Sequence, residues 1–444
     1  MKNILGAIVL AIAIVPASAH AQFSPTPEGG PPTKTTYVKL ANNANAILVE
    51  PVTPNAKSRI LVIATHPEHV NNFNYFTAWA LSKYGYRAMM VNYFGPETSY
   101  YEFLQPLAEA IKAARGVPGV EKVVLIGHST GGPELTSYQD VAENGPKACQ
   151  GPERIAKCDG KGLDSLPKAD GVILMDSNAG APERTIALNP AIDAHHPRAN
   201  NAALDIFDPK NGFDPKTKLA TYSPEFLDKF FKAQGAKANQ VIDEALMRLD
   251  KIQKGEGEYK DDEPFVVSGA SVIINGARPE LADHRLLGKT HAPHTFLKAD
   301  GTTPVTIIPQ ALPAIAAPQL EDTLANSTIN GTVKHYLSFQ ALRVTPDYHM
   351  TEDSIVGVNW RTTPNSVQGN LQGITVPTLV VSGTCAPHLV LLETAYDLSA
   401  AKDKEMIGVE GANHGLMPCK PEYGDTFKRA FDYADSWLSK PGRF

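Results

Sequence analysis

The chain has 444 residues, of which 43% are hydrophobic and 20% are charged, and its formal net charge is −6. This length exceeds the roughly 100–200 residues of a typical domain, so it predicts one large domain with an insertion, or two domains. The composition is globular and excludes a disordered or collagen-like chain. The mildly negative charge gives no broad cationic surface, so we expect no nucleic-acid partner.

The first 21 residues have the pattern of a secretory signal peptide. A lysine at position 2 precedes an apolar run over 4–15, and the A-x-A sequence at 19–21 predicts cleavage after Ala21. An apolar run of about 12 residues is shorter than the roughly 20 that a membrane-spanning helix needs. No other stretch of the sequence is long and apolar enough to span a membrane. We therefore expect a secreted or periplasmic protein.

The four cysteines support this location, because disulfides form outside the cytoplasm. Cys149 and Cys158 enclose a short polar loop that a local bridge would close, whereas Cys385 and Cys419 each follow one of the last two predicted strands. We therefore predict the pairs Cys149–Cys158 and Cys385–Cys419. A zinc site is the alternative, but the sequence has no C-x-x-C spacing to favour it.

Two short segments, 37–40 and 46–50, are predicted to pair as a hairpin across a turn rich in asparagine. Beyond them, short apolar runs alternate with segments of helical character. The predicted strands are 59–64, 87–93, 122–126 and 171–175, and the helices between them are 72–84, 100–115 and 131–143. Such alternation indicates right-handed crossovers and a parallel sheet that is buried on both faces. The fold class is therefore predicted as α/β.

The alternation stops over 185–373, which contains proline-rich stretches and an amphipathic segment near 224–254. It resumes with strands at 378–382 and 405–409 and helices at 389–401 and 422–438. A compact domain does not tolerate so long a structureless loop. We therefore expect 185–373 to be a folded cap that is inserted into the sheet domain.

The pentapeptide GHSTG at 127–131 stands between a predicted strand and a predicted helix. A G-x-S-x-G sequence in this position is typical of a nucleophile elbow, whose flanking glycines leave room for a sharp turn. Ser129 is therefore the candidate nucleophile. A glycine-rich helix cap with an incidental serine is the structural alternative.

A serine nucleophile needs a base within hydrogen-bond reach, and this base is normally a histidine. Of the 13 histidines, His414 fits best, because it follows the last predicted strand in the sequence VEGANHG. Gly411 and Gly415 would permit the tight loop that such a histidine requires.

The acid that orients the histidine should stand at the end of a strand. In many hydrolases it follows the strand before the histidine, but this chain reads SGTCAPH there and offers no carboxylate. Asp176, at the end of the strand after the nucleophile helix, is the preferred candidate. Glu393 is the alternative.

An oxyanion hole needs backbone N–H groups that point at the developing negative charge. Thr130, which follows the nucleophile, is expected to provide one. The second should come from the loop after the first parallel strand, where Pro67 has no N–H. Glu68 or His69 is therefore the expected second donor.

Through GHSTG, VEGANHG and the order of the strands, the chain resembles the α/β-hydrolase superfamily, in particular its serine esterases and lipases. The match covers 36–184 and 374–444. The resemblance implies a mostly parallel eight-stranded sheet flanked by helices, a triad of Ser129, His414 and an acid, an acyl-enzyme intermediate and no cofactor. The implied substrate is a small-molecule or polymeric carboxylic ester.

Three alternatives remain open. The same triad cleaves amides, lactones or polyesters in other proteins, because it does not choose the leaving group. The missing carboxylate after 378–382 also permits a non-catalytic binding module on a hydrolase fold. A metal site is a third possibility, suggested by the histidines at 195–196 and at 284, 291 and 294, but none of these has helical ligand spacing and we expect no metal.

Overall fold

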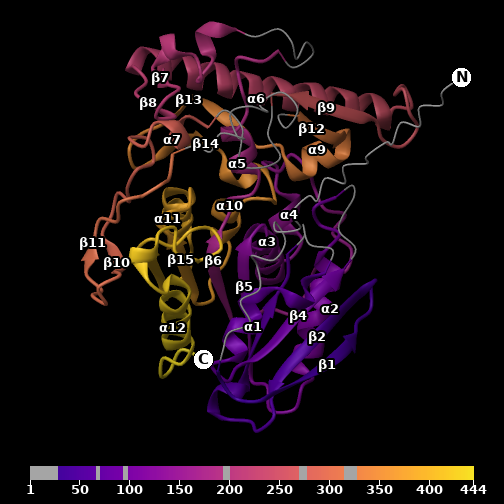
Figure 1. The fold of residues 1–444 in the computed structure, drawn as a ribbon. Helices are drawn as coiled ribbons and strands as arrows, with labels where there is room; N and C mark the ends of the chain where they lie inside the picture. The colour runs from indigo at the N-terminus through magenta and orange to yellow at the C-terminus, as the bar shows by residue number, and fades with distance from the viewer. Residues whose placement is uncertain (1–28, 67–70, 94–98, 194–200, 270–277, 315–327) are drawn as a thin grey trace, which may run out of the picture.

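A ten-stranded sheet, in the order β1-β2-β4-β3-β5-β6-β15-β16-β10-β11, forms the centre of the protein (Figure 1). The computed structural model describes residues 29–66, 71–93, 99–193, 201–269, 278–314 and 328–444. The strands of the sheet are β1 (Thr33–Lys39), β2 (Ala44–Pro51), β3 (Ile60–Ala64), β4 (Arg87–Tyr93), β5 (Lys122–Ser129), β6 (Gly171–Ser177), β10 (His294–Leu297), β11 (Val305–Thr306), β15 (Thr378–Gly383) and β16 (Lys404–Val409). All neighbours are parallel except β1 with β2, β2 with β4 and β10 with β11.

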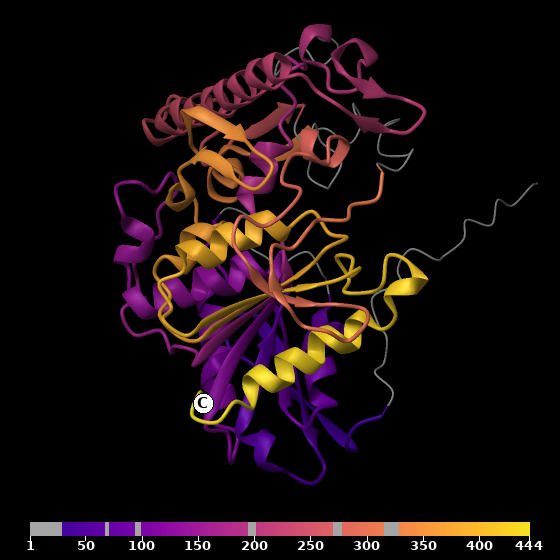
Figure 2. The same ribbon diagram turned by 90° about the vertical axis from the view of Figure 1, so that its left-hand side faces the viewer.

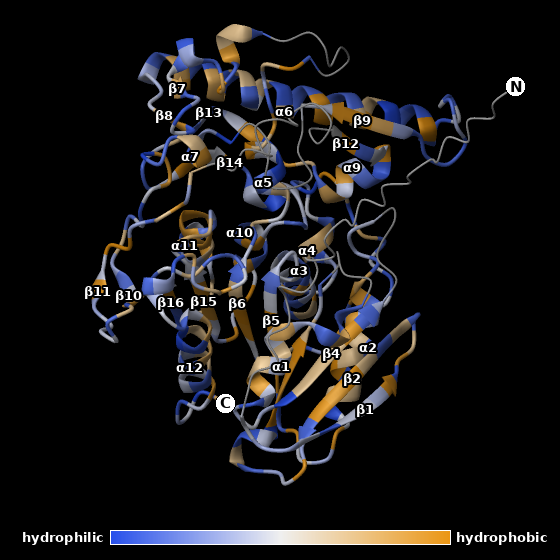
Figure 3. Ribbon diagram, viewed as in Figure 1, coloured by the Kyte–Doolittle hydropathy of each residue, from blue (hydrophilic) through white to orange (hydrophobic). Residues whose placement is uncertain are grey.

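Helices cover both faces of this sheet (Figure 2). One face packs against α1 (Phe76–Ser82) and α12 (Thr426–Leu438). The other packs against α2 (Leu104–Arg115), α3 (Gly131–Asn144), α10 (Val367–Leu371) and α11 (Leu389–Leu398). Along β5, Val123 and Leu125 face α2 and α3, while Val124 and Ile126 face the opposite layer. Alternate residues of a strand point to opposite faces, so a strand that is covered twice has a continuous apolar run, as the hydrophobic colour of the strands shows in Figure 3.

The predicted α/β architecture of a mostly parallel sheet flanked by helices is confirmed, although the sheet has ten strands rather than the eight that were expected. The two additional strands, β10 and β11, come from the middle of the chain and extend the sheet beyond β16. They have four and two residues. Such short strands do not produce the long apolar runs by which the other parallel strands were predicted.

The rest of the middle segment lies at the end of the sheet where β6 leads into α5 (Figures 1 and 2). The long helix α6 (Pro224–Gln253) begins where the side chain of Ser223 accepts a hydrogen bond from the backbone of Phe226, and Pro224 occupies the first turn, where no intrahelical N–H bond is lost. The remaining α-helices and strands of the described residues are α4 (Lys147–Gln150), α5 (Ala181–Ile186), α7 (Pro279–Ala282), α9 (Val333–Phe339), β7 (Phe213–Asp214), β8 (Leu219–Ala220), β9 (Pro264–Ser268), β12 (Thr328–Thr332), β13 (Val344–Met350) and β14 (Ile355–Val358).

Two apolar clusters hold this part together, one around Phe230 and Phe231 and the other around Val241 and Ile242 of the same helix. The first cluster also includes Val390 of α11, so it is continuous with the sheet layer. The division of the chain into a split core, 36–184 and 374–444, and a cap over 185–373 stays a prediction.

The expected signal peptide at 1–21 lies outside the described residues. Among the residues that are described, no helix combines the length and the apolar character needed to cross a bilayer.

Candidate active site

Ser129 stands at the sharp turn between β5 and α3, with a φ of 52°. Positive φ is uncommon for a residue with a side chain and marks a constrained turn. The neighbouring glycines are required by close contacts. A Cβ on Gly127 would lie 2.6 Å from the Cα of Gly132, and a Cβ on Gly131 would lie 2.4 Å from the carbonyl oxygen of Thr65. The pentapeptide thus forms the strand, turn and helix that its pattern predicts.

His414 lies in the loop after β16 and contacts Ser129 directly. Its Nε2 atom is 3.0 Å from Ser129 Oγ. The loop is shaped by Asn413, whose side-chain oxygen accepts from the backbone of Gly415 and Met417. Gly411 has a φ of 74° there. The sequence therefore places the histidine on a turn that holds its ring toward the serine.

Asp176 lies on the other side of His414, with Oδ2 at 2.8 Å from His414 Nδ1. Its side chain is fully buried, and Oδ1 accepts from the backbone N–H of Gly383 at 2.9 Å and from Ser382 Oγ at 3.3 Å. Burial alone would raise the pKa of this carboxyl group, but the charges and hydrogen bonds of His388 and His414 hold its pKa below the ordinary value of aspartate.

His128, the histidine within GHSTG, contacts the backbone of His414. His128 Nε2 lies 2.6 Å from the carbonyl oxygen of His414, and the two rings stack with centroids 4.6 Å apart. Since a carbonyl only accepts, Nε2 carries the proton, and Nδ1 accepts from the hydroxyl of Tyr75 at 2.5 Å. Burial lowers the pKa of His128 to about 3, so this ring is neutral at physiological pH.

Glu393, the alternative acid, is not brought to Ser129 or His414. It is buried on α11, where its carboxylate accepts from the backbone N–H groups of His291 and Ala292, at 2.9 and 3.0 Å. It also lies 2.8 Å from His294 Nε2. Of the two carboxylates that the sequence offered, Asp176 is the one beside the histidine.

The oxyanion donors are only partly described. Thr130 follows Ser129 as expected, at the N-cap of α3, and its hydroxyl lies 3.0 Å from His66 Nε2. His66 is buried at the end of the first parallel strand. Glu68 and His69 lie outside the described residues, so the second donor stays a prediction.

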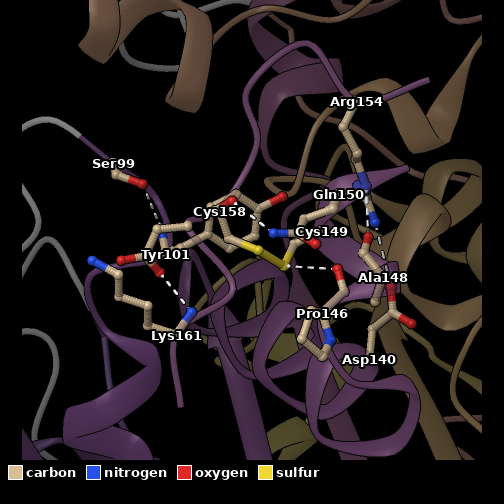
Figure 4. The surroundings of a disulfide bond; sticks show 11 residues. Ser99, Tyr101, Asp140, Pro146, Ala148, Cys149, Gln150, Arg154, Cys158 and Lys161 are labelled. Carbon is tan, nitrogen blue, oxygen red and sulfur yellow. Dashed lines mark hydrogen bonds and ion pairs between the residues drawn. A yellow bond between two sulfur atoms is a disulfide. The ribbon is translucent and has the colours of Figure 1, made fainter. Parts of the chain in front are cut away.

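Both expected disulfides are present in the structure. The Cys149–Cys158 bridge closes a polar loop beside α3, where Arg154 donates to the carbonyl oxygen of Ala148 (Figure 4). The Cys385–Cys419 bridge joins the loop after β15 to the loop that follows His414. The second bridge therefore ties together two loops at the candidate site.

Sequence reasoning missed His388, the last residue of SGTCAPH. It is buried, and its Nδ1 atom lies 3.0 Å from the same Asp176 oxygen that contacts His414. No local pattern marks it, because its partner is 212 residues away in the chain. The signal that could have found it is its position after β15, since parallel strands end at the same edge of a sheet.

A metal site was not expected. Of the described residues, Asp176, His388 and His414 form a group that could hold a metal ion, with ligand atoms within 4.8 Å of one another. Their mutual hydrogen bonds account for this closeness. The histidines at 195–196 lie outside the described residues, and the absence of a metal stays a prediction.

The strand order decides the fold. The first eight strands of the sheet run β1-β2-β4-β3-β5-β6-β15-β16, with the second antiparallel to its neighbours. The serine elbow follows the fifth strand and the histidine follows the eighth, as in α/β hydrolases. The chain has the α/β-hydrolase fold. The resemblance that the sequence motifs indicated is confirmed at this level.

The chain matches no protein-family model and no curated protein sequence. Among solved structures it is similar to brefeldin A esterase, described as a bacterial homologue of human hormone-sensitive lipase, at 10% identity and a TM-score of 0.41 over 93% of this chain and 76% of that one. Carboxyl esterase 2 from the fungus Tuber melanosporum has 12% identity and a TM-score of 0.40 over 94% and 89%. Est1E from Butyrivibrio proteoclasticus has 11% identity and a TM-score of 0.37 over 90% and 98%. With TM-scores of 0.41 or below these likenesses carry no argument about this chain, and the fold rests on the strand order and the place of the elbow.

Proposed function

We propose that the protein is a secreted serine hydrolase that cleaves carboxylic esters through an acyl-enzyme intermediate. The observation that carries this proposal is the continuous chain of hydrogen-bond distances from Ser129 Oγ through His414 to Asp176, at 3.0 and 2.8 Å. A serine is a weak nucleophile unless a base accepts its proton, and His414 Nε2 is within reach to do so. Asp176 holds the opposite ring nitrogen and stabilises the imidazolium that forms.

The reaction proceeds in two halves. Ser129 Oγ attacks the ester carbonyl carbon while its proton passes to His414 Nε2, and the negative charge on the carbonyl oxygen is held by backbone N–H groups that include Thr130. The C–O bond to the alcohol then breaks as His414 returns the proton to the leaving oxygen. A water molecule, deprotonated by His414, attacks the acyl-serine and releases the carboxylic acid.

Secretion is part of the proposal. It is supported by the signal-like sequence at 1–21 and by the two disulfides, which persist in oxidising compartments. The middle segment leaves the sheet just after Asp176, on the same side as Ser129, so we assign to it the selection of the acyl and alcohol groups.

The test of the nucleophile combines labelling and turnover. The wild type should react with a fluorophosphonate probe and hydrolyse p-nitrophenyl esters, and Ser129→Ala should abolish labelling and lower kcat by at least about 10⁴-fold. Hydrolysis that survives Ser129→Ala would refute this nucleophile. An inert but folded wild type that takes no label would instead support a binding module.

The acid is tested by comparing Asp176→Asn with Glu393→Gln at matched folding. Because an amide at position 176 no longer stabilises the imidazolium, kcat should fall by roughly 10²–10⁴-fold, while Glu393→Gln should change stability alone. A collapse of kcat only in Glu393→Gln would overturn the assignment. A panel of matched esters, amides, lactones and polyesters then identifies the leaving group.

A further inference from the structure

His388 is the second histidine on the candidate triad acid. Its Nδ1 atom lies 3.0 Å from Asp176 Oδ2, and on its other side Nε2 lies 3.4 Å from Glu183 Oε1. The side chain of His388 is only 3% exposed, and its ring centroid is 4.8 Å from that of His414. Asp176 thus contacts two imidazoles. The ring of His414 also contacts Ser129, whereas the ring of His388 is buried.

The protonation of His388 follows from these contacts. A neutral imidazole carries one N–H and one acceptor nitrogen, whereas both nitrogens of His388 face carboxylate oxygens, which accept. A ring with a proton on each nitrogen, an imidazolium, satisfies both contacts, the hydrogen bond of Nδ1 and the ion-pair distance of Nε2. Burial alone would lower the pKa of His388, but the charges of Glu183 and Asp176 raise its pKa above the ordinary value of histidine.

Glu183 belongs to α5, which follows β6, and connects the candidate triad to a buried line of charges. One of its oxygens accepts from the backbone N–H of Ala179 at 2.8 Å, and the other lies 3.9 Å from Arg278 Nη1. Arg278 in turn donates to Glu280 at 2.6 Å. The charges alternate in sign from Asp176 through His388, Glu183 and Arg278 to Glu280, so each buried charge has an opposite neighbour.

We propose that His388 is a positioning residue of the triad, which as an imidazolium orients the Asp176 carboxylate and sets the pH range in which His414 is free to act as base. This inference rests on the proposed function. The groups that face His388 are Asp176 from β6, Glu183 from α5, His414 from the loop after β16 and Arg278 from the segment before α7. Without the imidazolium, the carboxylates of Asp176 and Glu183 would have no cation between them.

The electrostatic effect has a definite sign. The His388 ring, which contacts the carboxylates of Asp176 and Glu183, lies with its centroid 4.8 Å from that of His414, and a positive charge on it opposes a second positive charge in the same buried cluster. The enzyme should therefore stay active at a lower pH than one with a neutral residue at position 388.

The experiment measures kcat/KM against pH on a soluble p-nitrophenyl ester for the wild type, His388→Asn and Glu183→Gln. His388→Asn should move the acid limb of the profile to higher pH by at least about one unit, because it removes the cation. As long as His388 keeps both ring protons, Glu183→Gln should move the limb in the opposite direction or not at all, because neutralising Glu183 leaves the site no more negative than in the wild type.

His294→Asn is the matched control. It also removes a buried histidine that is bonded to a buried carboxylate, Glu393, but outside the candidate site. It should lower thermal stability without moving the acid limb. An unshifted profile for His388→Asn would overturn the proposal. If His388→Asn does not fold, the protonation state of the His388 ring in the wild type decides.

A second readout is independent of ester hydrolysis. In nitrogen-15 histidine spectra of the wild type near pH 7.5, the resonances of His388 should show both ring nitrogens protonated. Substitution of Glu183 by glutamine should lower the pH at which the ring loses a proton. A neutral His388 ring in the wild type would refute the imidazolium even in a protein that hydrolyses esters. A charged ring in a protein that takes no fluorophosphonate label would instead refute the proposed function alone.

Discussion

Gly132 lies one turn beyond the candidate nucleophile, where α3 packs against β6, the strand that carries the candidate acid. A Cβ added to Gly132 would lie 1.7 Å from Ser177 Oγ and 2.5 Å from Ser177 Cβ. Ordinary carbon–carbon contacts are about 3.5–4.0 Å, so Gly132→Ala must push α3 and the end of β6 apart by about 1 Å. Ser177 follows Asp176 directly, so the displacement would separate the nucleophile from the acid.

Two consequences are expected for Gly132→Ala. The overpacked contact should lower the free energy of unfolding by about 1–3 kcal/mol. A misplacement of about 1 Å in a catalytic constellation can lower the rate by about 10²-fold, so kcat on a p-nitrophenyl ester should fall by that order. Stability is measured by urea unfolding followed by circular dichroism, and kcat is measured on the fraction that a fluorophosphonate probe labels.

Gly145→Ala is the matched control at the other end of the same helix. Gly145 has a φ of 68°, and a Cβ there would meet nothing within 4 Å. Alanine in this backbone region costs about 1–3 kcal/mol, so the control should lose similar stability and keep its kcat. The double variant Gly132→Ala/Ser177→Gly removes both clashing atoms and should recover activity. An unchanged kcat in Gly132→Ala, or no recovery in the double variant, would refute the proposed contact between the elbow and the acid strand.

Two further predictions concern stability. Glu134 is buried, and neither of its carboxylate oxygens has a hydrogen-bond partner in the described structure, so desolvation raises its pKa well above the usual value. The folded state then binds a proton that the unfolded state releases, and stability falls as pH rises through this range. In urea unfolding at pH 5, 6 and 7, the free energy of unfolding of Glu134→Gln should therefore rise relative to that of the wild type by up to about 1.4 kcal/mol per pH unit. A difference between the two proteins that is constant with pH would contradict this. The Cys385–Cys419 bridge closes a loop with a sequence separation of 34, and its removal should lower the free energy of unfolding by up to about 4 kcal/mol. It should also lower kcat, because both loops that the bridge joins reach the candidate site. Removal of Cys149–Cys158, with a separation of 9, should cost up to about 3 kcal/mol and leave kcat unchanged, and equal effects on kcat would contradict this distinction.

Much of the fold could be predicted because its signals are local. Each central strand is buried on both faces and therefore has a continuous apolar run, and the elbow at Ser129 needs glycines at fixed positions. The same reasoning missed β10, whose four residues lie in a segment without flanking helices. Its place in the sheet comes from pairing with β16, more than a hundred residues later, and such a contact has no counterpart in the local pattern.

In the candidate site, only the residues that stand in a local sequence pattern were predictable. Ser129 and His414 stand in glycine-rich turns after strands, which the sequence displays directly. The choice between Asp176 and Glu393 depended on which strand end faces the histidine. Both are fully buried carboxylates, so burial does not separate them, and only the tertiary contacts distinguish the one beside His414 from the one beside His294.

The loop after β15 contains the feature that left a non-catalytic binding module open as an alternative. Many hydrolases have their acid there, and this chain has His388 instead, 3.0 Å from Asp176. A carboxylate in that place would put two anions within hydrogen-bond distance of each other, and one of them would be forced to hold a proton. With the acid at the end of β6, the position after β15 favours a cation. A histidine in place of a carboxylate after β15 therefore fits the proposed triad with Asp176 as its acid.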